Sequence, residues 1–439
     1  MTRSANKYMK PIIVETCLNT KRSLTRAHPW PLLGQRAGVR AGVVPTRPAF
    51  HRIISLLAVL ALAGALKLHA AGTNFNSGSD GHLGALNVTT DTTLDLPPDG
   101  IFHYTTITVA GGATLRFNRN ALNTPVYLLA TGDVTISGTI DVSGGSPNGR
   151  TPGPGGPGGF DGGWGGNGGT GFGGTGIGGD GLGPGGGNHS LNVCCCYYHS
   201  WGGAFATVNS AGSGNTYGNS LCVPLIGGSG GAGTDGNPGG GGGGGGGAVL
   251  ISSSSRIDLY GVVYARGADT YPGPGSGGAV RLVAPLVTGN GGIDTLGGYR
   301  GNCGWYGGTG RSRIDCLDGF AVRSLHANNS VSSRGSQMFV FPPYTNRLDI
   351  IEAAGRLISE GSTNGVVITL SAGSNPTNNV VVQARGFTND VPIRLVVTPN
   401  DRASTSYDVT LAMTNNPSRL AVPVVLPIDS TVRVHVWTR

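Results

Sequence analysis

The stretch 134–145 alternates apolar and polar residues. Its apolar positions, two before and two after a glycine at position 138, are Val134, Ile136, Ile140 and Val142. A period of two residues predicts β-strands with one buried face. Gly138, where the alternation pauses, predicts a bend or a bulge.

The same pattern returns at 257–267, where Gly261 matches Gly138. The four apolar positions are matched by Ile257, Leu259, Val263 and Ala265. The likeness extends upstream to 126–130 and 248–252, and a weaker third copy covers 278–284 and 292–298. A strand pair that recurs about every 20 residues cannot bury its apolar face alone and must stack on its neighbours. We therefore predict an all-β chain built on a parallel β-helix.

The domain organisation follows from changes along the chain. We expect an N-terminal cap with short strands at 73–100, a first clear coil at 105–117, and a parallel β-helix over residues 72–336 as a whole. From 337 to 439 glycine becomes rarer and eight short strands are expected, which predicts a C-terminal β-sandwich. These strands are 338–341, 347–352, 366–370, 380–385, 393–398, 407–413, 420–426 and 432–437. A helical turn within 350–360 is the alternative there.

Two glycine-rich insertions, at about 144–187 and 227–247, interrupt the predicted coils. From Gly153 to Gly174 every third residue is glycine, but proline is too sparse for a collagen triple helix. Polyproline-II strands packed through glycine faces and a flexible loop both fit this segment. The second insertion ends in an unbroken glycine run from Gly239 to Gly247, which we interpret as a loop returning the chain to the coil at Ala248.

The basic charge is concentrated in residues 1–71. This segment holds 11 of the 30 Lys and Arg residues but only one of the 22 acidic residues. The remainder has 19 Arg, no Lys and 21 acidic residues. It has no basic arm for phosphates, so we predict no nucleic-acid partner.

Residues 1–71 also carry an export signal. An apolar segment at 53–66 follows His51-Arg52 and precedes Ala70-Ala71, the pattern of a signal peptide. An uncleaved anchor is the alternative, although the segment is short for a membrane span. We predict a basic leader whose first 50 residues are disordered, and a mature chain that is secreted or displayed on the cell surface. Its only membrane contact would be through the signal peptide.

Six cysteines follow the leader, an even number that fits disulfides in an exported protein. The disulfide candidates are Cys194, Cys195, Cys196, Cys222, Cys303 and Cys316. The tract that includes His189, Cys194–Cys196 and His199 also resembles a metal site. Three adjacent cysteines do not easily reach one tetrahedral ion, so we predict no metal and no cofactor.

Enzymes of the pectin-lyase type use a β-helix, so glycan cleavage has to be considered. Such chemistry needs clustered carboxylates. After the leader the chain has two glutamates, Glu352 and Glu360, both outside the predicted coils, and its aspartates are spread singly. We predict that the protein is not an enzyme and has no catalytic residues.

Aromatic residues gather in and near the insertions. They can stack on sugars or on a partner, or they can anchor the loops to the side of the coils. The surface-contact candidates are Trp164, Tyr197, Tyr198, Trp201, Trp305 and Tyr306.

Two stretches, 120–145 and 277–284, resemble exported glycine-rich bacterial proteins of uncharacterised function. In these, a coil ending in Gly-Thr-Ile-Asp-x-Ser-Gly-Gly precedes glycine- and proline-rich loops. The resemblance implies an exported parallel β-helix and no catalytic residues. We predict a structural or adhesive protein that acts through extended β-helix surfaces and self-assembly, with itself or an extracellular polysaccharide as partner. A carbohydrate-binding or carbohydrate-degrading β-helix protein is the alternative.

Overall fold

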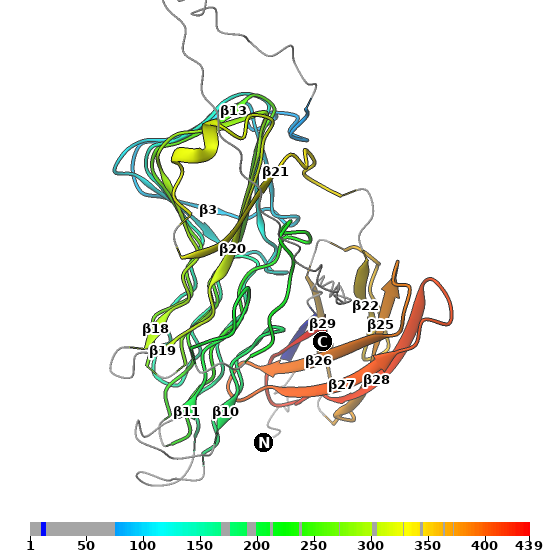
Figure 1. Cartoon of the computed structure of the whole chain (residues 1–439). Helices are drawn as coiled ribbons and strands as arrows, with labels where there is room; N and C mark the ends of the chain where they lie inside the picture. The colour runs from blue at the N-terminus through cyan, green and yellow to red at the C-terminus, as the bar shows by residue number, and fades with distance from the viewer. Residues whose placement is uncertain are drawn as a thin grey trace, which may run out of the picture. The chain divides into compact units, whose positions relative to one another are not determined.

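The computed structural model describes residues 10–14, 75–167, 176–190, 199–210, 214–236, 239–271, 273–300, 305–327, 329–342, 346–362, 365–371 and 373–439. The fold is all-β, with parallel sheets in the N-terminal part and antiparallel sheets in the C-terminal part (Figure 1). The described residues contain no α-helix and one short 3-10 helix, η2 (Ala321–Ser324).

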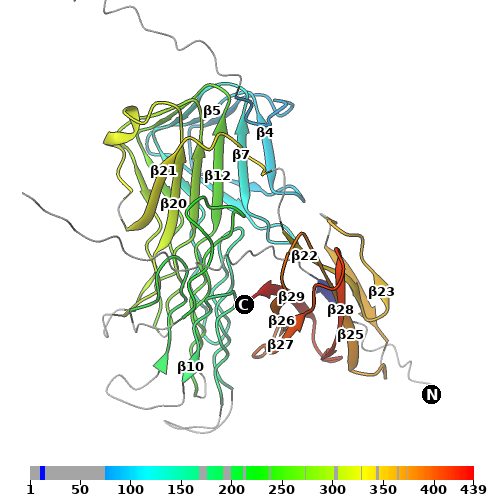
Figure 2. The same ribbon diagram turned by 45° about the vertical axis from the view of Figure 1, so that its right-hand side comes forward.

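The first part contains three parallel sheets, and from β2 to β20 the chain adds one strand to each of them in turn. One sheet contains β2 (Leu86–Val88), β5 (Ile107–Val109), β8 (Val134–Ile136), β13 (Arg256–Leu259) and β16 (Leu286–Thr288). The second contains β3 (Thr92–Asp95), β6 (Thr114–Asn118), β9 (Thr139–Asp141), β14 (Val262–Tyr264) and β17 (Gly292–Asp294). The third contains β4 (Ile101–Tyr104), β7 (Val126–Ala130), β12 (Ala248–Ser253), β15 (Ala279–Val283), β20 (Gly310–Asp315) and β21 (Ser330–Gly335) (Figure 2).

The register predicted from the repeat is confirmed. Ile257 pairs with Val134 between β13 and β8, and Val263 pairs with Ile140 between β14 and β9. Strand β12 lies between β7 and β15, so the three copies of the upstream segment are neighbours in one sheet. The segment expected as a cap already contains β2 and β3, which pair with β5 and β6. Stacking therefore begins earlier than predicted.

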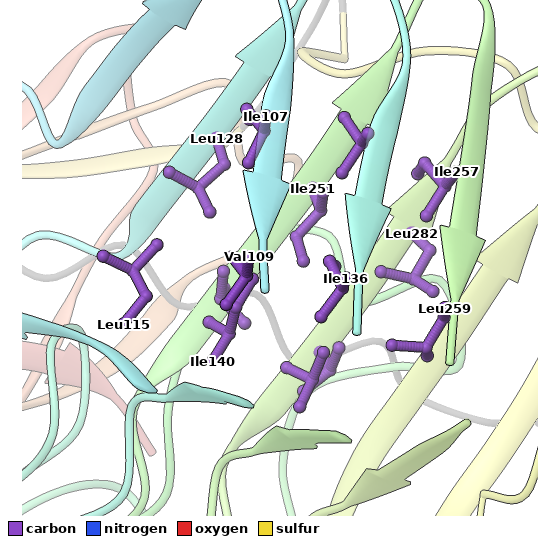
Figure 3. Packing of buried hydrophobic residues seen from close by; sticks show 14 of the residues in the cluster. Ile107, Val109, Leu115, Leu128, Ile136, Ile140, Ile251, Ile257, Leu259 and Leu282 are labelled. Carbon is purple, nitrogen blue, oxygen red and sulfur yellow. The ribbon is translucent and has the colours of Figure 1, made fainter. Parts of the chain in front are cut away.

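One hydrophobic cluster draws its residues from all three parallel sheets (Figure 3). Ile107, Leu115, Leu128, Ile140 and Ile257 are fully buried in it. Burying each aliphatic side chain contributes about 1.5–3 kcal/mol, so this cluster is the main source of stability for the sheets.

The two glycine-rich insertions form a packed structure. We call segments 153–167, 176–187, 227–236 and 239–247 the glycine bundle. Their residues are assigned to no strand, and most are buried. Figure 1 shows several of these segments as extended chains running side by side.

The run 239–247 shows how the bundle is held together. Amides three residues apart donate to the same neighbour: Gly239, Gly242 and Gly245 bond carbonyls within 160–166. The amides of residues 241, 244 and 247 bond carbonyls within 142–149. Those of residues 243 and 246 bond carbonyls within 273–276. Three residues per turn with bonds only to other segments is the geometry of polyproline II.

Glycine is required in this run because neighbouring backbones occupy the space of a side chain. A Cβ at Gly242 would meet the Gly231 carbonyl, and one at Gly244 would meet the Pro154 carbonyl, both closer than real Cβ atoms approach. The run leads into β12 at Ala248, as expected, but it is not an unpacked loop, because its backbone lies among hydrogen-bonded neighbours. Of the two alternatives for the first insertion, packed polyproline-II segments agree with its described residues.

The C-terminal part contains two sheets that share an apolar cluster. Their strands pair antiparallel, except for one parallel pair noted below. The first sheet has the order β23 (Arg356–Leu357), β22 (Arg347–Ala353), β25 (Thr377–Arg385) and β28 (Ser418–Val425). The second has the order β24 (Val366–Leu370), β1 (Lys10–Val14), β29 (Val432–Thr438), β26 (Val391–Pro399) and β27 (Thr405–Leu411). The arrangement is sandwich-like.

Seven of the eight strands predicted here are present, and the one at 338–341 is wrong. That segment instead covers side chains of the third parallel sheet, with Phe339 under the Arg281 guanidinium and Phe341 beside the Tyr127 ring. Its apolar residues reflect this packing. The alternative of a helical turn within 350–360 is also wrong, because β22 and β23 form a hairpin.

Strand β1 lies within the predicted leader. It pairs antiparallel with β24 and parallel with β29, so the expected disorder is wrong for Lys10–Val14. Removal of residues 1–71 would leave the facing edges of β24 and β29 without this partner. The predicted signal peptide and its cleavage boundary lie outside the described residues. Within the part of the chain that is described, no helix has the length and apolarity to span a membrane.

Candidate functional site

Carboxylates in the parallel-sheet part are bound by groups of the same chain. Every aspartate side chain within residues 75–336 accepts a hydrogen bond from a backbone amide, a polar side chain or an arginine. Arg116, for example, lies between Asp91 and Asp141, at 3.5 and 3.6 Å. Each acid is thus held as an acceptor by its own neighbours, an arrangement that suits structure better than proton transfer.

A surface rich in tyrosine begins at the end of β14. The Arg266 guanidinium carbon lies 4.3 Å from the centre of the Tyr264 ring. The same guanidinium pairs with Asp294 of β17, the strand beside β14. Stacking and charge pairing together hold Tyr264 and Arg266 in a fixed arrangement on the outside of the sheet.

The surface continues along two neighbouring segments, 265–271 and 294–299. The amides of Ala265, Gly267 and Thr270 donate to carbonyls of Asp294, Leu296 and Tyr299. This pairing extends the order of the sheet beyond the ends of β14 and β17.

Exposed tyrosines lie at the far end of these segments. Tyr299 and Tyr306 pair across a hairpin, β18 (Tyr299–Arg300) with β19 (Trp305–Tyr306), and their ring centres are 4.8 Å apart. They are 39% and 44% exposed, and nearby Tyr271 is 50% exposed. We call Tyr264, Tyr271, Tyr299 and Tyr306 the tyrosine flank.

The hairpin is joined to the glycine segments at its base. The amide of Gly307 donates to Gly298, and the amide of Gly298 donates to Gly275. Gly275 also lies against the run 239–247, because a Cβ there would meet the Gly244 carbonyl. The exposed aromatic rings therefore stand on a backbone fixed by hydrogen bonds.

The surface-contact candidates from the sequence differ in exposure and location. Tyr306 is exposed and belongs to the tyrosine flank. Trp164 and Trp201 are half-buried, with their carbonyls hydrogen-bonded to amides of the glycine segments. Trp305 lies in β19, and Tyr197 and Tyr198 lie outside the described residues. The half-buried tryptophans fit the anchoring alternative better than the stacking one.

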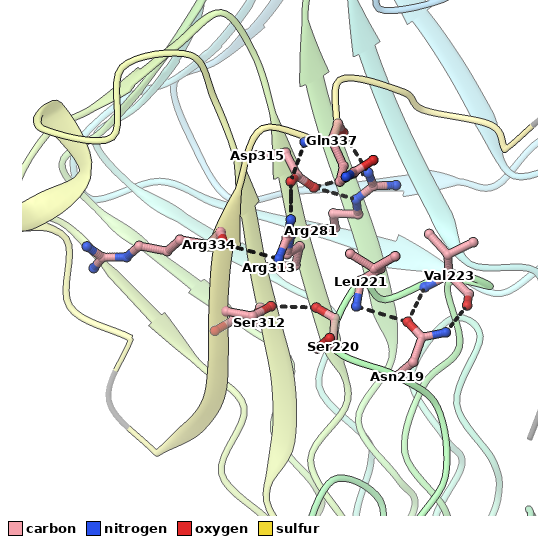
Figure 4. Close-up of polar contacts among 11 residues, drawn as sticks. Asn219, Ser220, Leu221, Val223, Arg281, Ser312, Arg313, Asp315, Arg334 and Gln337 are labelled. Atoms are coloured by element: carbon pink, nitrogen blue, oxygen red, sulfur yellow. Dashed lines mark hydrogen bonds and ion pairs between the residues drawn. The ribbon is translucent and has the colours of Figure 1, made fainter. Parts of the chain in front are cut away.

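A buried charge network lies on the outer face of the third parallel sheet (Figure 4). Asp315 accepts from Arg281 at 3.1 Å and from Arg313 at 2.5 Å, and its carboxylate also accepts the Gln337 amide at 3.0 Å. Burial lowers the pKa of Arg281 despite the neighbouring Asp315 carboxylate. The Arg281 guanidinium donates to the Gln337 carbonyl at 3.2 Å. These bonds fasten the segment after β21 to the sheet, which is a structural role.

A cavity of about 190 Å³ adjoins this network, with Arg281, Cys222 and Tyr127 in its lining. Burial raises the pKa of Tyr127 to about 12 and that of the Cys222 thiol to about 11. Both groups are therefore neutral at physiological pH, and neither is a ready nucleophile.

Cys222 and Cys316 are both free, buried thiols. The structure thus gives no support to a disulfide at either position. Cys194, Cys195, Cys196 and Cys303 lie outside the described residues. Disulfides among those four stay a prediction.

Metal-ligating groups come together at a place that the sequence analysis did not single out. Asp80, His82 and His103 place one donor atom each within 4.8 Å of one another. In the tract considered from the sequence, the described side chain of His189 contacts Asp180 at 2.7 Å.

Sequence reasoning missed most of the tyrosine flank and all of the Asp80, His82 and His103 group. Tyr299 and Tyr306 stand symmetrically about a short segment, and Gly298 and Gly307 flank them, which is a hairpin signal. The metal-ligating group has no such signal, because 20 residues lie between His82 and His103 and only the fold brings them together.

Comparison with known proteins adds no relative: no family model, curated protein or solved structure matches the chain.

Proposed function

We propose that the chain is an exported structural or adhesive protein, secreted or held at the cell surface. Its three parallel sheets are the coils of a parallel β-helix, and its antiparallel sheets form a β-sandwich. The observation that carries this proposal is the tyrosine flank, in which three exposed rings and the half-buried Tyr264 lie on a backbone held by the sheet and by glycine segments. Preorganised aromatic groups bind with little loss of conformational entropy.

Such a surface suits repeated, individually weak contacts. An exposed aromatic face next to an arginine and aspartates can stack on a sugar ring and hydrogen-bond its hydroxyl groups. It can also pack against a second copy of the chain. Many such contacts give high avidity without a deep site. An extracellular polysaccharide and the protein itself are thus the proposed partners.

A catalytic role is the weaker proposal. General acid–base cleavage of a glycan needs one carboxyl to donate a proton and a second to act from the other side. The aspartates of the parallel-sheet part are each bound by donors of the same chain, such as Arg116 between Asp91 and Asp141. This arrangement supports a binding surface rather than a reaction centre.

The experiment compares attachment by three forms of the full chain. These are the wild type, the double variant Tyr299→Ala/Tyr306→Ala, and the control Tyr260→Ala. Tyr260 is 53% exposed but lies on the turn between β13 and β14. We expect the double variant to bind a polysaccharide panel or immobilised copies of the protein at least about tenfold more weakly, with the control unchanged.

The same panel is assayed for released sugars. We expect no bond cleavage by any form. Cleavage that disappears on substitution of a single aspartate would replace the adhesive proposal with the enzymatic one. Equal attachment by all three forms would remove the tyrosine flank from the binding surface.

A further inference from the structure

Asp80, His82 and His103 form a group of metal-ligating side chains that none of the preceding features uses. The Asp80 carboxylate oxygen lies 2.6 Å from the His82 Nδ1 atom and 3.7 Å from the His103 Nδ1 atom. The two imidazole rings are 5.3 Å apart and tilted by 35°. Three donors therefore converge on one point from two separate segments.

The backbone fixes these segments against each other. Leu83 donates its amide to the His103 carbonyl at 3.0 Å, and Thr105 donates to Gly84 at 2.7 Å. On the other side of the group, the Ser79 hydroxyl donates to the Tyr104 carbonyl at 2.8 Å. The loop that carries Asp80 and His82 is thus fastened to residues 103–105 at both of its ends, through Ser79 on one side and Leu83 and Gly84 on the other. Little ordering remains to be done when a ligand binds.

The turn geometry also directs the side chains. Gly81 adopts φ of +71°, a conformation that glycine takes without strain. This lets the Asp80 carboxylate accept the His82 amide at 3.1 Å, so both side chains stay on the same side of the loop. The Asp80 amide donates a long hydrogen bond to the His103 Nδ1 atom at 3.4 Å, and a metal ion bound through this nitrogen would displace that bond.

We propose that Asp80, His82 and His103 bind a divalent transition-metal ion of the zinc class, with water completing the coordination. Two imidazoles and one carboxylate are ligands that Zn²⁺, Co²⁺, Ni²⁺ and Cu²⁺ accept, whereas Ca²⁺ and Mg²⁺ favour sites made of oxygen alone. The ion would take the place of the hydrogen bond between Asp80 and the His82 ring. This inference is independent of the proposed adhesive function.

The geometry and exposure agree with this assignment. The Asp80 carboxylate lies within 4.8 Å of a donor atom of each histidine, so all three ligands can face one cation. The side chains of Asp80 and His82 are 66% and 58% exposed, and that of His103 is 23% exposed. An ion would enter directly from solvent and keep an open coordination position.

The test titrates Co²⁺ and Zn²⁺ into the full chain carrying Cys194→Ser, Cys195→Ser and Cys196→Ser, which removes the one cluster of adjacent thiols that could compete for the ion. In this background we compare His82→Ala, His103→Ala and Asp80→Asn with the control His326→Ala. His326 is an exposed histidine elsewhere in the same part of the chain. The readouts are metal stoichiometry, affinity and the Co²⁺ absorption spectrum.

We expect one Co²⁺ per chain, a d–d spectrum without a thiolate charge-transfer band, and binding at least about tenfold weaker in each of the three variants than in the His326→Ala control. Zn²⁺ should also raise the melting temperature of the control but not of the three variants. Equal affinity in all four proteins, or a Zn²⁺-induced shift that survives in His103→Ala, would overturn the proposal.

Discussion

The parallel sheets and the glycine bundle are both closely packed, but different interactions stabilise them. In the sheets, side chains alternate and the inward ones fill a core with residues such as Ile140 and Val263. In the glycine bundle, the run 239–247 has no side chains, and its amides bond several neighbouring segments. Sheets therefore gain stability from apolar burial, whereas the bundle depends on hydrogen bonds and close backbone contact.

This difference has an energetic consequence. A hydrogen bond contributes about 0.5–1.5 kcal/mol net, and ordering glycine costs about 0.5–1 kcal/mol more than ordering alanine. In the bundle, the free energy gained from hydrogen bonds therefore exceeds the cost of ordering the chain by less than apolar burial does in the sheets. It needs the sheets to set its register, which they do through junctions such as Gly247 leading directly into β12. The bundle in turn supports the hairpin that carries Tyr299 and Tyr306, through backbone hydrogen bonds.

The largest effect should come from charge in the core of the sheets. Ile140 and Val263 are fully buried and pair with each other, so Ile140→Asp or Val263→Asp places an unpaired charge in the stacked interior. We expect each to cost several kcal/mol and to abolish folding. Thr139→Asp, on the outward face of the same strand, should be tolerated. Thermal melts test this, and equal melting of all three variants would break the assigned register.

A smaller but still clear effect should come from a single methyl group in the bundle. Gly242→Ala forces apart two backbones at the Gly231 carbonyl, and we expect a loss of about 1–3 kcal/mol. Gly319→Ala is the matched control, since nothing lies within 4 Å of its Cβ position. It should change stability by less than about 0.5 kcal/mol. Urea unfolding measures the stability of both variants. If Gly242→Ala loses as little stability as Gly319→Ala, the run is not packed.

The smallest effect concerns the buried thiol of Cys222. Burial raises its pKa from 9.0 to about 11, so the unfolded thiol ionises first as the pH rises. Its contribution to stability is complete below pH 9 and is lost as the pH rises from 9 to about 11. Cys222→Ala should therefore show a shallower decline across this window. If the urea midpoints of the wild type and Cys222→Ala fell equally between pH 9 and 11, the burial of this thiol would be contradicted.

Side-chain patterns explain what the sequence could and could not predict. The match of Gly261 to Gly138 was readable because flanking aliphatic residues fix the register, and a Cβ at Gly261 would indeed meet the Gly138 carbonyl. The run from Gly239 to Gly247 carries no such pattern, so its order became visible only through its backbone hydrogen bonds. At 338–341, apolar residues that cover Arg281 and Tyr127 imitated a strand.

The same reasoning applies to the candidate surfaces. Tyr306 was predictable as an exposed aromatic in a glycine-rich segment, but its pairing with Tyr299 depends on a hairpin. Asp80, His82 and His103 meet only because the loop before β2 lies along β4. Long-range contacts of this kind leave no local periodicity.

The most direct test of an ordered glycine bundle is hydrogen exchange at the amides of Gly241–Gly247, read by NMR on glycine-labelled protein. Because these amides donate to carbonyls of neighbouring segments, we expect protection comparable to that of the adjoining strand β12. Exchange at the rate of an unstructured peptide, while β12 remains protected, would show that the run is an unpacked loop and that the glycine bundle is not ordered.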